Sequence, residues 1–285
     1  MKDGKFFIFP YAYRAIGIVV VLCLQKIQED VMQIFANRFR FNPATTLNVG
    51  IERECFLTRG EGNIVPLASD VLRLLSDRQR FGYELSACQL EDRVGPCIIG
   101  DLSSQFALNE QEIQRAEAQL GFERLYIEVA PESMPLDVFP DPTGRYQEIT
   151  TNMPRETLLA ACRVAATHIH VGMPSHAVAL SVYNMVIKHL DRLCQLGDRS
   201  DGQRLQIYHI MAPDYLPRPY ADWEKFYEEA CEKKFDGDPR RCWHLIRLSV
   251  HGTIEFRMFG STPDVEQIVL WADDCRRLCE EAMTV

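Results

Sequence analysis

The amino-acid sequence predicts an α+β fold: a curved, mainly antiparallel sheet that is covered on one face by helices. Strand-like segments alternate with long amphipathic helices along the chain, and 47% of the residues are apolar, which is enough for a sizeable core. The last two strand-like segments flank a tight turn at His251-Gly252, and a tight turn favours antiparallel pairing. A sheet with one apolar face buries that face under helices.

The first 41 residues are predicted to be an N-terminal extension of unknown role, because Asn42-Pro43 interrupts the pattern and the folded domain then covers residues 42–285. Within the extension, the apolar run 15–24 is too short to span a bilayer. It is predicted to form a short helix or strand. A secretory signal is the alternative, since basic residues precede the run.

The segment 47–57 alternates between apolar and polar residues, which predicts a strand, and the residues 58–63 that follow predict a turn. The segment 66–77 has the apolar spacing of a helix, with Ser69 as a candidate N-cap. The segment 81–91 is predicted to be extended. These elements predict a strand, a helix and a second strand in succession.

A second helix is predicted over 109–121. Asn109 is its candidate N-cap, Glu112 completes a capping-box-like pattern, and Gly121 can end it. The segment 122–131 that follows alternates in the manner of a strand. This part of the chain therefore predicts one helix and one strand.

In the second half of the chain, the segment 158–173 begins like an apolar helix and ends like a strand. The segments 175–197 and 222–235 have the spacing of amphipathic helices, the first of them long. The segment 242–260 predicts two strands around His251-Gly252, and 262–282 predicts a closing helix.

The composition excludes some functional classes. The formal net charge is −9 and there is no basic block, so the chain is a poor candidate for a nucleic-acid-binding protein. No apolar run is long enough to predict a membrane span. The expected partners are therefore neither nucleic acid nor a membrane.

The ten cysteines are scattered and form no CxxC pattern. The chain is long and rich in core residues, so it does not need disulfides for stability. We expect mostly buried, reduced thiols in a cytoplasmic protein. A zinc site is disfavoured because the spacings do not fit one.

Charged and imidazole side chains occur at five places in otherwise apolar strand segments. They are Glu52 and Glu54, Glu84 and Glu91, His168 and His170, Glu255 and Arg257, and Arg247. Residues i and i+2 of a strand point to the same side, so the pairs two apart each share a face. Glu84 and Glu91 are an odd number apart, so a bulge or a bend must lie between them if they share a face.

Each of these pairs alone has a simpler interpretation, a solvated sheet face or an ordinary ion pair. Together they are harder to explain in this way, because unpaired carboxylates are costly when buried. Magnesium or manganese would neutralise them, since both ions prefer oxygen ligands that are often shared with substrate phosphates. Arginine binds phosphate through its planar fork. The combination predicts a nucleotide-phosphate site, and no Gly-rich phosphate loop is present.

These residues lie in motifs that resemble those of the type 2 glutamate–cysteine ligases, also called carboxylate–amine ligases, in the glutamine synthetase-like superfamily. The segments that carry the resemblance are "LNVGIERECFLT", "YELSACQLE", "GRYQEI", "ATHIHVG" and "SVHGTIEFRMFGSTP". They occur in the family's order over about residues 46–283. The E-x6-E pattern and the closing G-T-x-E-x-R are the more specific of these motifs.

The resemblance implies that residues 42–285 form a glutamine synthetase-like catalytic domain whose curved sheet is a funnel for ATP and divalent cations. In that superfamily ATP phosphorylates a substrate carboxylate, and an amine then attacks the acyl phosphate. The resemblance thus implies an ATP-dependent carbon–nitrogen ligase that acts on a small-molecule carboxylate, with glutamate as the candidate, and an amine. Its cofactors would be ATP and Mg²⁺ or Mn²⁺.

By the same resemblance, each polar residue receives a role. Glu52, His168 and Glu255 would hold the cation that bridges the ATP phosphates. Glu54, Glu84 and Glu91 would hold a second cation beside the substrate. His170 would contact nucleotide phosphate, and Arg257 and Arg247 would bind the nucleotide and steady the transferring phosphoryl group.

Two departures from the family leave the amine substrate open: the segment "DRVGP" after Glu91, and a shorter C-terminal region. One alternative function is a catalytically inactive homologue that binds nucleotide or metal. A guanidino phosphotransferase of the same superfamily is a further alternative, and the motifs match it less well. An exposed sheet edge could pair two subunits in a homo-oligomer.

Overall fold

The structure is a computed structural model that describes residue 26, residues 30–75 and residues 77–284. The apolar run 15–24, for which a short helix or strand was one expectation and a secretory signal the other, lies outside the described residues. Among the described residues, no helix is long and apolar enough to cross a membrane.

The predicted α+β fold is confirmed. Eight strands form one sheet, and its central order is β3-β4-β1-β6-β8-β7. All strand pairings in it are antiparallel. The strands are β1 (Val49–Arg59), β2 (Asn63–Ile64), β3 (Phe81–Tyr83), β4 (Gln89–Cys97), β5 (Glu123–Leu125), β6 (Ala166–Gly172), β7 (Ile246–Ser249) and β8 (Thr253–Gly260).

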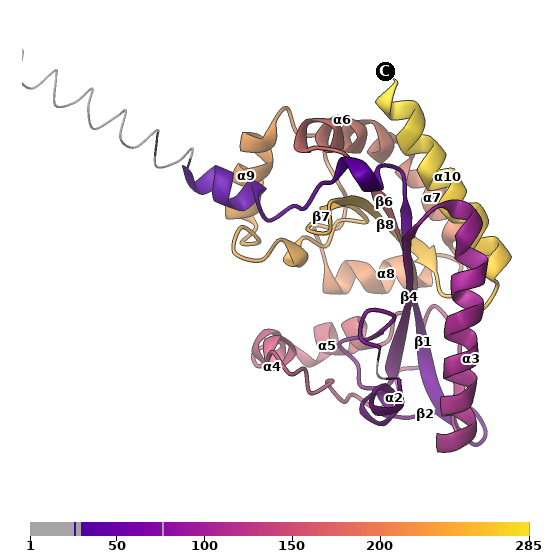
Figure 1. Cartoon of the computed structure of the whole chain (residues 1–285). Helices are drawn as coiled ribbons and strands as arrows, with labels where there is room; N and C mark the ends of the chain where they lie inside the picture. The colour runs from indigo at the N-terminus through magenta and orange to yellow at the C-terminus, as the bar shows by residue number, and fades with distance from the viewer. Residues whose placement is uncertain (1–25, 27–29, 76, 285) are drawn as a thin grey trace, which may run out of the picture.

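Nine α-helices, α2 to α10, accompany the sheet in the described part of the chain. They are α2 (Ala68–Leu74), α3 (Leu102–Leu120), α4 (Arg145–Thr150), α5 (Arg155–Cys162), α6 (His176–Val186), α7 (Leu190–Gly197), α8 (Gln203–Met211), α9 (Trp223–Glu232) and α10 (Val265–Met283). Short 3-10 turns occur at η1 (Pro43–Thr45), η2 (Ile99–Asp101), η3 (Ile187–His189) and η4 (Pro239–Arg241). Figure 1 shows their arrangement.

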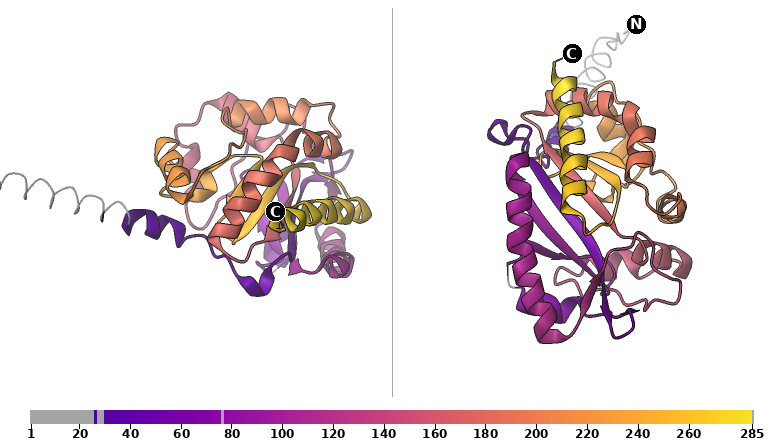
Figure 2. Two further views of the ribbon diagram at one scale, coloured as in Figure 1. Left: turned by 90° about the horizontal axis from the view of Figure 1, so that it is seen from above. Right: turned by 90° about the vertical axis from the view of Figure 1, so that its right-hand side faces the viewer.

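The main core lies between one face of the sheet and the helices α3, α6, α7 and α10. Figure 2 (right) looks onto this face, with α3 in magenta and α10 in yellow crossing the strands. Ile51, Ile169 and Phe256 point into this core from adjacent strands, and all three are fully buried. Because side chains alternate along a strand, the residues next to these three in each strand point to the opposite face of the sheet.

Two predicted helix starts are wrong. The helix α2 begins at Ala68 rather than behind Ser69, and the Ala68 amide donates to the Ala87 carbonyl, 3.0 Å away, which takes the place of a side-chain cap. The helix α3 begins at Leu102, so Asn109 lies inside it. Asn109 is buried there because its side chain donates to the Arg93 carbonyl and accepts from Arg80. The predicted end of α3 at Gly121 is confirmed, with φ of 64°.

Two other elements differ from their predicted extent. The predicted long helix 175–197 is interrupted by η3, after which α7 packs on β8. The predicted strand 122–131 pairs with β1 only over Glu123–Leu125. Beyond that point the chain leaves β1, and the Ala130 amide donates to the carbonyl of Arg163, 2.8 Å away, in the segment that leads into β6. These limits depend on neighbouring segments that are distant in sequence.

Residues 30–41, the C-terminal part of the predicted extension, pack on the domain. Residues 30–36 are helical, and Phe35 and Phe39 are buried against Phe226 of α9. The Arg40 amide then donates to the Val250 carbonyl, 3.1 Å away, beside the turn between β7 and β8. Residues 30–41 therefore contact both α9 and the turn that connects two strands of the sheet.

Gly252 makes this close approach possible. Its φ is +76°, and a Cβ built there would lie 2.1 Å from the Arg40 carbonyl oxygen. We expect Gly252→Ala to lower the free energy of unfolding by about 2 kcal/mol or more, because it adds left-handed strain to a backbone clash. Urea denaturation measures this. Gly237→Ala is the matched control, since nothing lies within 4 Å of the Cβ it would add; an equal loss in both variants would contradict the close contact.

The cysteines that the structure describes are all free, and most are buried. This agrees with the expectation of reduced thiols that pack in the core. Cys275 and Cys279, one helical turn apart on α10, are both fully buried. Burial raises the pKa of each thiol, so both stay protonated at neutral pH.

Candidate active site

The face of the sheet that is turned away from the main core carries the polar residues of the strands. Pairing between strands aligns them in rows. Glu52 on β1 lies opposite His168 on β6, and His170 on β6 lies opposite Glu255 on β8. Arg247 on β7 lies opposite Glu255 from the other side. The predicted sharing of a face by His168 and His170 is therefore present in the structure.

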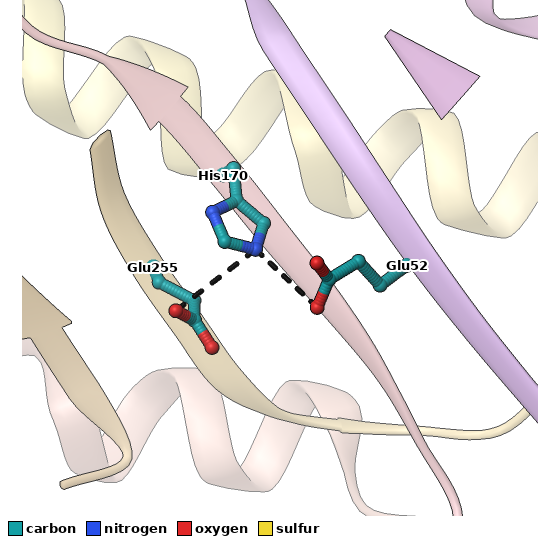
Figure 3. A group of neighbouring side chains, drawn as sticks. All are labelled: Glu52, His170 and Glu255. Atoms are coloured by element: carbon teal, nitrogen blue, oxygen red, sulfur yellow. Dashed lines mark ion pairs between the residues drawn. The ribbon is translucent and has the colours of Figure 1, made fainter. Parts of the chain in front are cut away.

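Glu52, His170 and Glu255 form the first acidic group (Figure 3). Each offers a ligand atom, and these atoms lie within 4.8 Å of one another. Nε2 of His170 is 3.5 Å from Oε2 of Glu52 and 4.0 Å from Oε2 of Glu255. Nδ1 of His170 is 2.8 Å from the Thr253 hydroxyl. Nε2 is buried without a hydrogen-bond partner, so it faces the two carboxylates with an unused ring nitrogen.

The resemblance grouped Glu52 and Glu255 with His168, whereas the structure brings His170 between them. β6 pairs irregularly with β8 between Thr167 and Ile169, and beyond this point His170 is aligned with Glu255. If the register of Thr167 with Phe259 continued, Glu255 would lie opposite Val171 and face the main core. The bulge therefore brings Glu255 onto the polar face beside His170.

His168 lies between the two carboxylates of β1. Its Nδ1 is 3.3 Å from Oε2 of Glu52, and its Nε2 is 3.6 Å from Oε1 of Glu54. Burial and the charge of Arg257 lower the pKa of His168 to about 4, although Glu52 acts in the opposite direction. Its imidazole is therefore neutral at physiological pH and has a lone pair available for a cation or a donor.

Glu54, Glu84 and Glu91 form the second acidic group, again with ligand atoms within 4.8 Å of one another. Glu54 and Glu91 lie opposite each other on β1 and β4. Glu84 reaches them because the chain bends after β3, between Tyr83 and Gln89, before it returns as β4. The bend that the spacing of Glu84 and Glu91 required is therefore present.

This second group holds protons when no cation is bound. Burial and the charge of Glu91 raise the pKa of Glu54 to about 8. Burial and the charge of Glu54 raise the pKa of Glu84 to about 7, and burial also raises the pKa of Glu91. Three carboxylates that are buried side by side disfavour their common ionisation, and a divalent cation would remove that penalty.

Glu255 is in a different electrostatic state because two arginines contact it. The Arg247 Nε donates to its Oε2 at 2.7 Å, and the Arg257 guanidinium donates to its Oε1. Glu255 is fully buried, and burial alone would raise the pKa of its carboxyl group. The charges of Arg247 and Arg257 outweigh burial and hold that pKa below its usual range.

A cavity of about 540 Å³ lies over the polar face of the sheet, which forms its floor. One wall is the segment from Pro142 to Tyr146, and another is the segment from Pro239 to Trp243. Six arginines line the cavity: Arg78, Arg93, Arg145, Arg240, Arg247 and Arg257. Of the predicted site residues, all line this cavity except Glu54, which lies beneath the floor with its Oε2 accepting from the Ala166 amide.

Arg93 is a site residue that the strand pattern did not predict, and its guanidinium contacts the Glu91 carboxylate. The signal was available, because Arg93 follows Glu91 by two positions and so shares its face of β4. Arg78 lies in a turn and Arg240 in the short 3-10 turn η4, and neither is long enough for a periodicity that predicts the direction of a side chain. Arg145 belongs to the "GRYQEI" segment, for which the motif gave no role.

The two acidic groups fit divalent cations by their chemistry. Their donors are carboxylate oxygens and one unpartnered imidazole nitrogen, a set that suits magnesium or manganese. Glu52, His170 and Glu255 would hold one ion, and Glu54, Glu84 and Glu91 would hold another. The arginines around them suit anions, because each carries a planar set of donors. A cavity with both features can bind a polyphosphate together with its cations.

Comparison with curated proteins gives two relatives. Over 255 residues the chain is 28% identical to "Putative glutamate--cysteine ligase 2-1" from Rhodococcus jostii (strain RHA1), covering 81% of this chain and 68% of that protein. Over 263 residues it is 23% identical to "Putative glutamate--cysteine ligase 2" from Gloeobacter violaceus (strain ATCC 29082 / PCC 7421), covering 80% and 66%. The resemblance seen in the sequence motifs is thereby confirmed. The chain spans about two thirds of the length of these relatives.

No family model matches the chain. Among solved structures, it is similar to Plasmodium falciparum glutamine synthetase, with a TM-score of 0.46 and 10% identity over 90% of this chain and 55% of that one. It is also similar to a structure described as a novel glutamine synthase homologue, with a TM-score of 0.42 and 13% identity over 90% of this chain and 59% of that one.

Proposed function

We propose that this chain is an ATP-dependent ligase that joins a carboxylate to an amine. The observation that carries the proposal is the convergence of two acidic groups and two arginines, Arg247 and the buried Arg257, on one face of an antiparallel sheet beneath a cavity. Buried acids in such number are costly unless cations and phosphates bind among them. The names of the two relatives, both of which contain glutamate–cysteine ligase, support the same reading.

The proposed reaction has two steps. A carboxylate oxygen of the substrate attacks the γ-phosphorus of ATP, the bond to the β–γ bridging oxygen breaks, and ADP leaves. The amine then attacks the carbonyl carbon of the acyl phosphate, phosphate leaves with the electron pair, and the amine proton is lost to solvent or a base. The products are an amide, ADP and phosphate.

The chain's own residues would act mainly by position and charge, as is general in phosphoryl transfer. Arg247 and Arg257 extend from adjacent strands toward the cavity and would bind the transferring phosphoryl oxygens. The contact between Glu52 and His168 would hold both side chains in the orientation that phosphate binding requires. Divalent cations bound at the acidic groups would neutralise negative charge on the phosphates.

Glutamate and cysteine are the first substrate pair to test, because both relatives are named for these two amino acids. The purified protein should release ADP in a coupled assay with ATP, Mg²⁺ and this pair, and it should bind ATP by calorimetry only when Mg²⁺ is present. Absence of ADP with every amino acid and amine offered would refute the ligase proposal. ATP binding without ADP release would instead support a nucleotide-binding homologue without chemistry.

Glu52→Gln should weaken magnesium-dependent ATP binding by about tenfold, because it removes a charge that contacts both histidines. Glu52 has a 26% exposed side chain, so this variant should fold. Calorimetry with and without Mg²⁺ measures the effect. Glu61→Gln, an exposed carboxylate in the turn after β1, is the control and should bind ATP as the wild type does. Equal affinities of the two variants would place the nucleotide elsewhere.

A further inference from the structure

One carboxylate organises the loop that forms the cavity wall beside β3. Asp141 is only 7% exposed and accepts five hydrogen bonds. Its Oδ1 accepts from the Tyr83 hydroxyl at 2.7 Å and from the Thr143 amide at 3.0 Å. Its Oδ2 accepts from the Thr143 hydroxyl at 2.7 Å and from the amides of Arg145 and Tyr146 at 3.0 and 3.3 Å. The start of α4 is thus tied to β3 through a single side chain.

Aromatic packing fixes the same loop against β3. The Tyr83 ring stacks on Phe139 with the centroids 4.3 Å apart and the planes at 8°. Tyr146 meets Tyr83 edge-on at 5.7 Å and 87°. Tyr83 is also the residue before Glu84 of the second acidic group. The loop position is therefore set relative to that group.

The loop that Asp141 orders carries Arg145 to the opposite wall of the cavity. The Arg145 Nε donates to Oδ2 of Asp238 at 3.1 Å, and the Arg240 Nε donates to Oδ1 of the same carboxylate at 2.7 Å. Both arginines line the cavity. One carboxylate thus serves two guanidinium groups, and within the described residues the terminal nitrogens of Arg145 donate no hydrogen bond. Donors of Arg145 therefore remain for an anion.

We propose that Asp141 is a positioning residue that holds Arg145 in place to bind an oxyanion at the wall of the cavity. The oxyanion is a carboxylate of the substrate or a phosphate of the nucleotide; both present the paired oxygens that a guanidinium binds. The identity of the anion rests on the proposed function. The role of Asp141 itself rests on the hydrogen bonds and the ion pair described above.

The test is calorimetric binding of three probes: ATP with Mg²⁺, L-glutamate, and tripolyphosphate. Asp141→Asn and Arg145→Gln should each weaken at least one probe by about tenfold, the loss expected when a charged donor is misplaced or removed. Because Asp141 acts through Arg145, the double variant should bind no more weakly than Arg145→Gln alone. A loss confined to glutamate identifies a carboxylate, and a loss shared by ATP and tripolyphosphate identifies a phosphate.

Two further variants complete the test. Asp137→Asn makes the same charge change at an exposed position of the same loop and should leave all three affinities unchanged. Tyr83→Phe keeps the stacked ring but removes one of the five hydrogen bonds, and should give a smaller loss even if Asp141→Asn fails to fold.

The outcomes separate this inference from the proposed function. If a folded Asp141→Asn variant binds all three probes normally, or if the losses add in the double variant, the inference is wrong. ATP binding by the wild type would still support the proposed function in that case. The wild type could instead bind glutamate or tripolyphosphate but not ATP, with this binding weakened in both single variants. That result would refute the proposed function and keep the inference. Binding of none of the probes by the wild type would overturn both.

Discussion

Glu255→Gln should lower the free energy of unfolding by about 3–5 kcal/mol, the usual cost of leaving a buried charge without its partner. Glu255 is fully buried and is the carboxylate that Arg247 and Arg257 share. The side chains of these arginines are only 13% and 9% exposed, so water can replace little of what they lose. The amide of glutamine would leave two guanidinium charges without a counter-charge.

The same substitution should abolish the magnesium-dependent binding of ATP, because Glu255 supplies one of the three ligand atoms of the first acidic group. Urea denaturation measures the stability and calorimetry measures the binding. Glu228→Gln is the control: its pair with Lys225 is about half exposed on both sides, and such pairs contribute about 1 kcal/mol or less. A loss in Glu255→Gln as small as in this control would contradict the electrostatic account of the site.

The stability of the metal-free protein should fall as the pH rises from 6.5 to 8. The pKa of Glu54 is raised to about 8 and that of Glu84 to about 7 in the folded state, against about 4.5 for an exposed glutamate. A carboxyl group with a raised folded pKa binds its proton more tightly when folded. The group stabilises the fold fully at a pH below its pKa in the unfolded chain. This stabilisation is lost as the pH rises through its pKa in the folded protein.

The range above pH 6.5 avoids the site groups that act in the opposite direction. Burial and Arg257 lower the pKa of His168 to about 4, so this histidine adds stability with rising pH only up to its unfolded pKa near 6.5. Glu255, whose pKa is depressed, changes stability only at lower pH. Glu91 and His170, whose pKa values are also raised, act in the same direction as Glu54 and Glu84. The expected loss from Glu54 and Glu84 is about 2 kcal/mol, from 1.36 kcal/mol per pKa unit.

Urea denaturation in a chelating buffer at pH 6.5 and 8 checks this prediction. Glu54→Gln should reduce the dependence on pH, because a glutamine oxygen can still accept from the Ala166 amide but does not titrate. Mn²⁺ or Mg²⁺ should restore more stability at pH 8 than at pH 6.5, since the cation competes with the protons of this group. Stability that rises over this range in the wild type would mean that the second acidic group is ionised and open to water.

Much of the site follows from the sequence because a strand has a period of two. That period places Glu52 with Glu54, His168 with His170, and Glu255 with Arg257, whatever the partners of each strand. The same rule applied to "EDR" would also have given Arg93 beside Glu91. The tight turn at His251-Gly252 gave the antiparallel pairing of β7 and β8 for an equally local reason.

Helix starts were less predictable, because a tertiary partner can replace a cap. Asn109 has the side chain of an N-cap, yet it lies within α3, where its hydrogen bonds go to Arg93 and Arg80 on other segments. Ser69 likewise does not cap α2, since the Ala87 carbonyl receives the first amide. A local pattern cannot reveal a partner that only folding brings near.

The sequence by itself determined the antiparallel α+β fold, the shared faces of the polar pairs and the kind of chemistry that their side chains favour. Only the tertiary structure decided that Glu255 lies opposite His170, through an irregularity between β6 and β8, and that a bend brings Glu84 to Glu91. The loop that Asp141 holds over the cavity was decided in the same way. Alternation along a strand is local, whereas register, bends and loop positions depend on contacts between residues that are far apart in the chain.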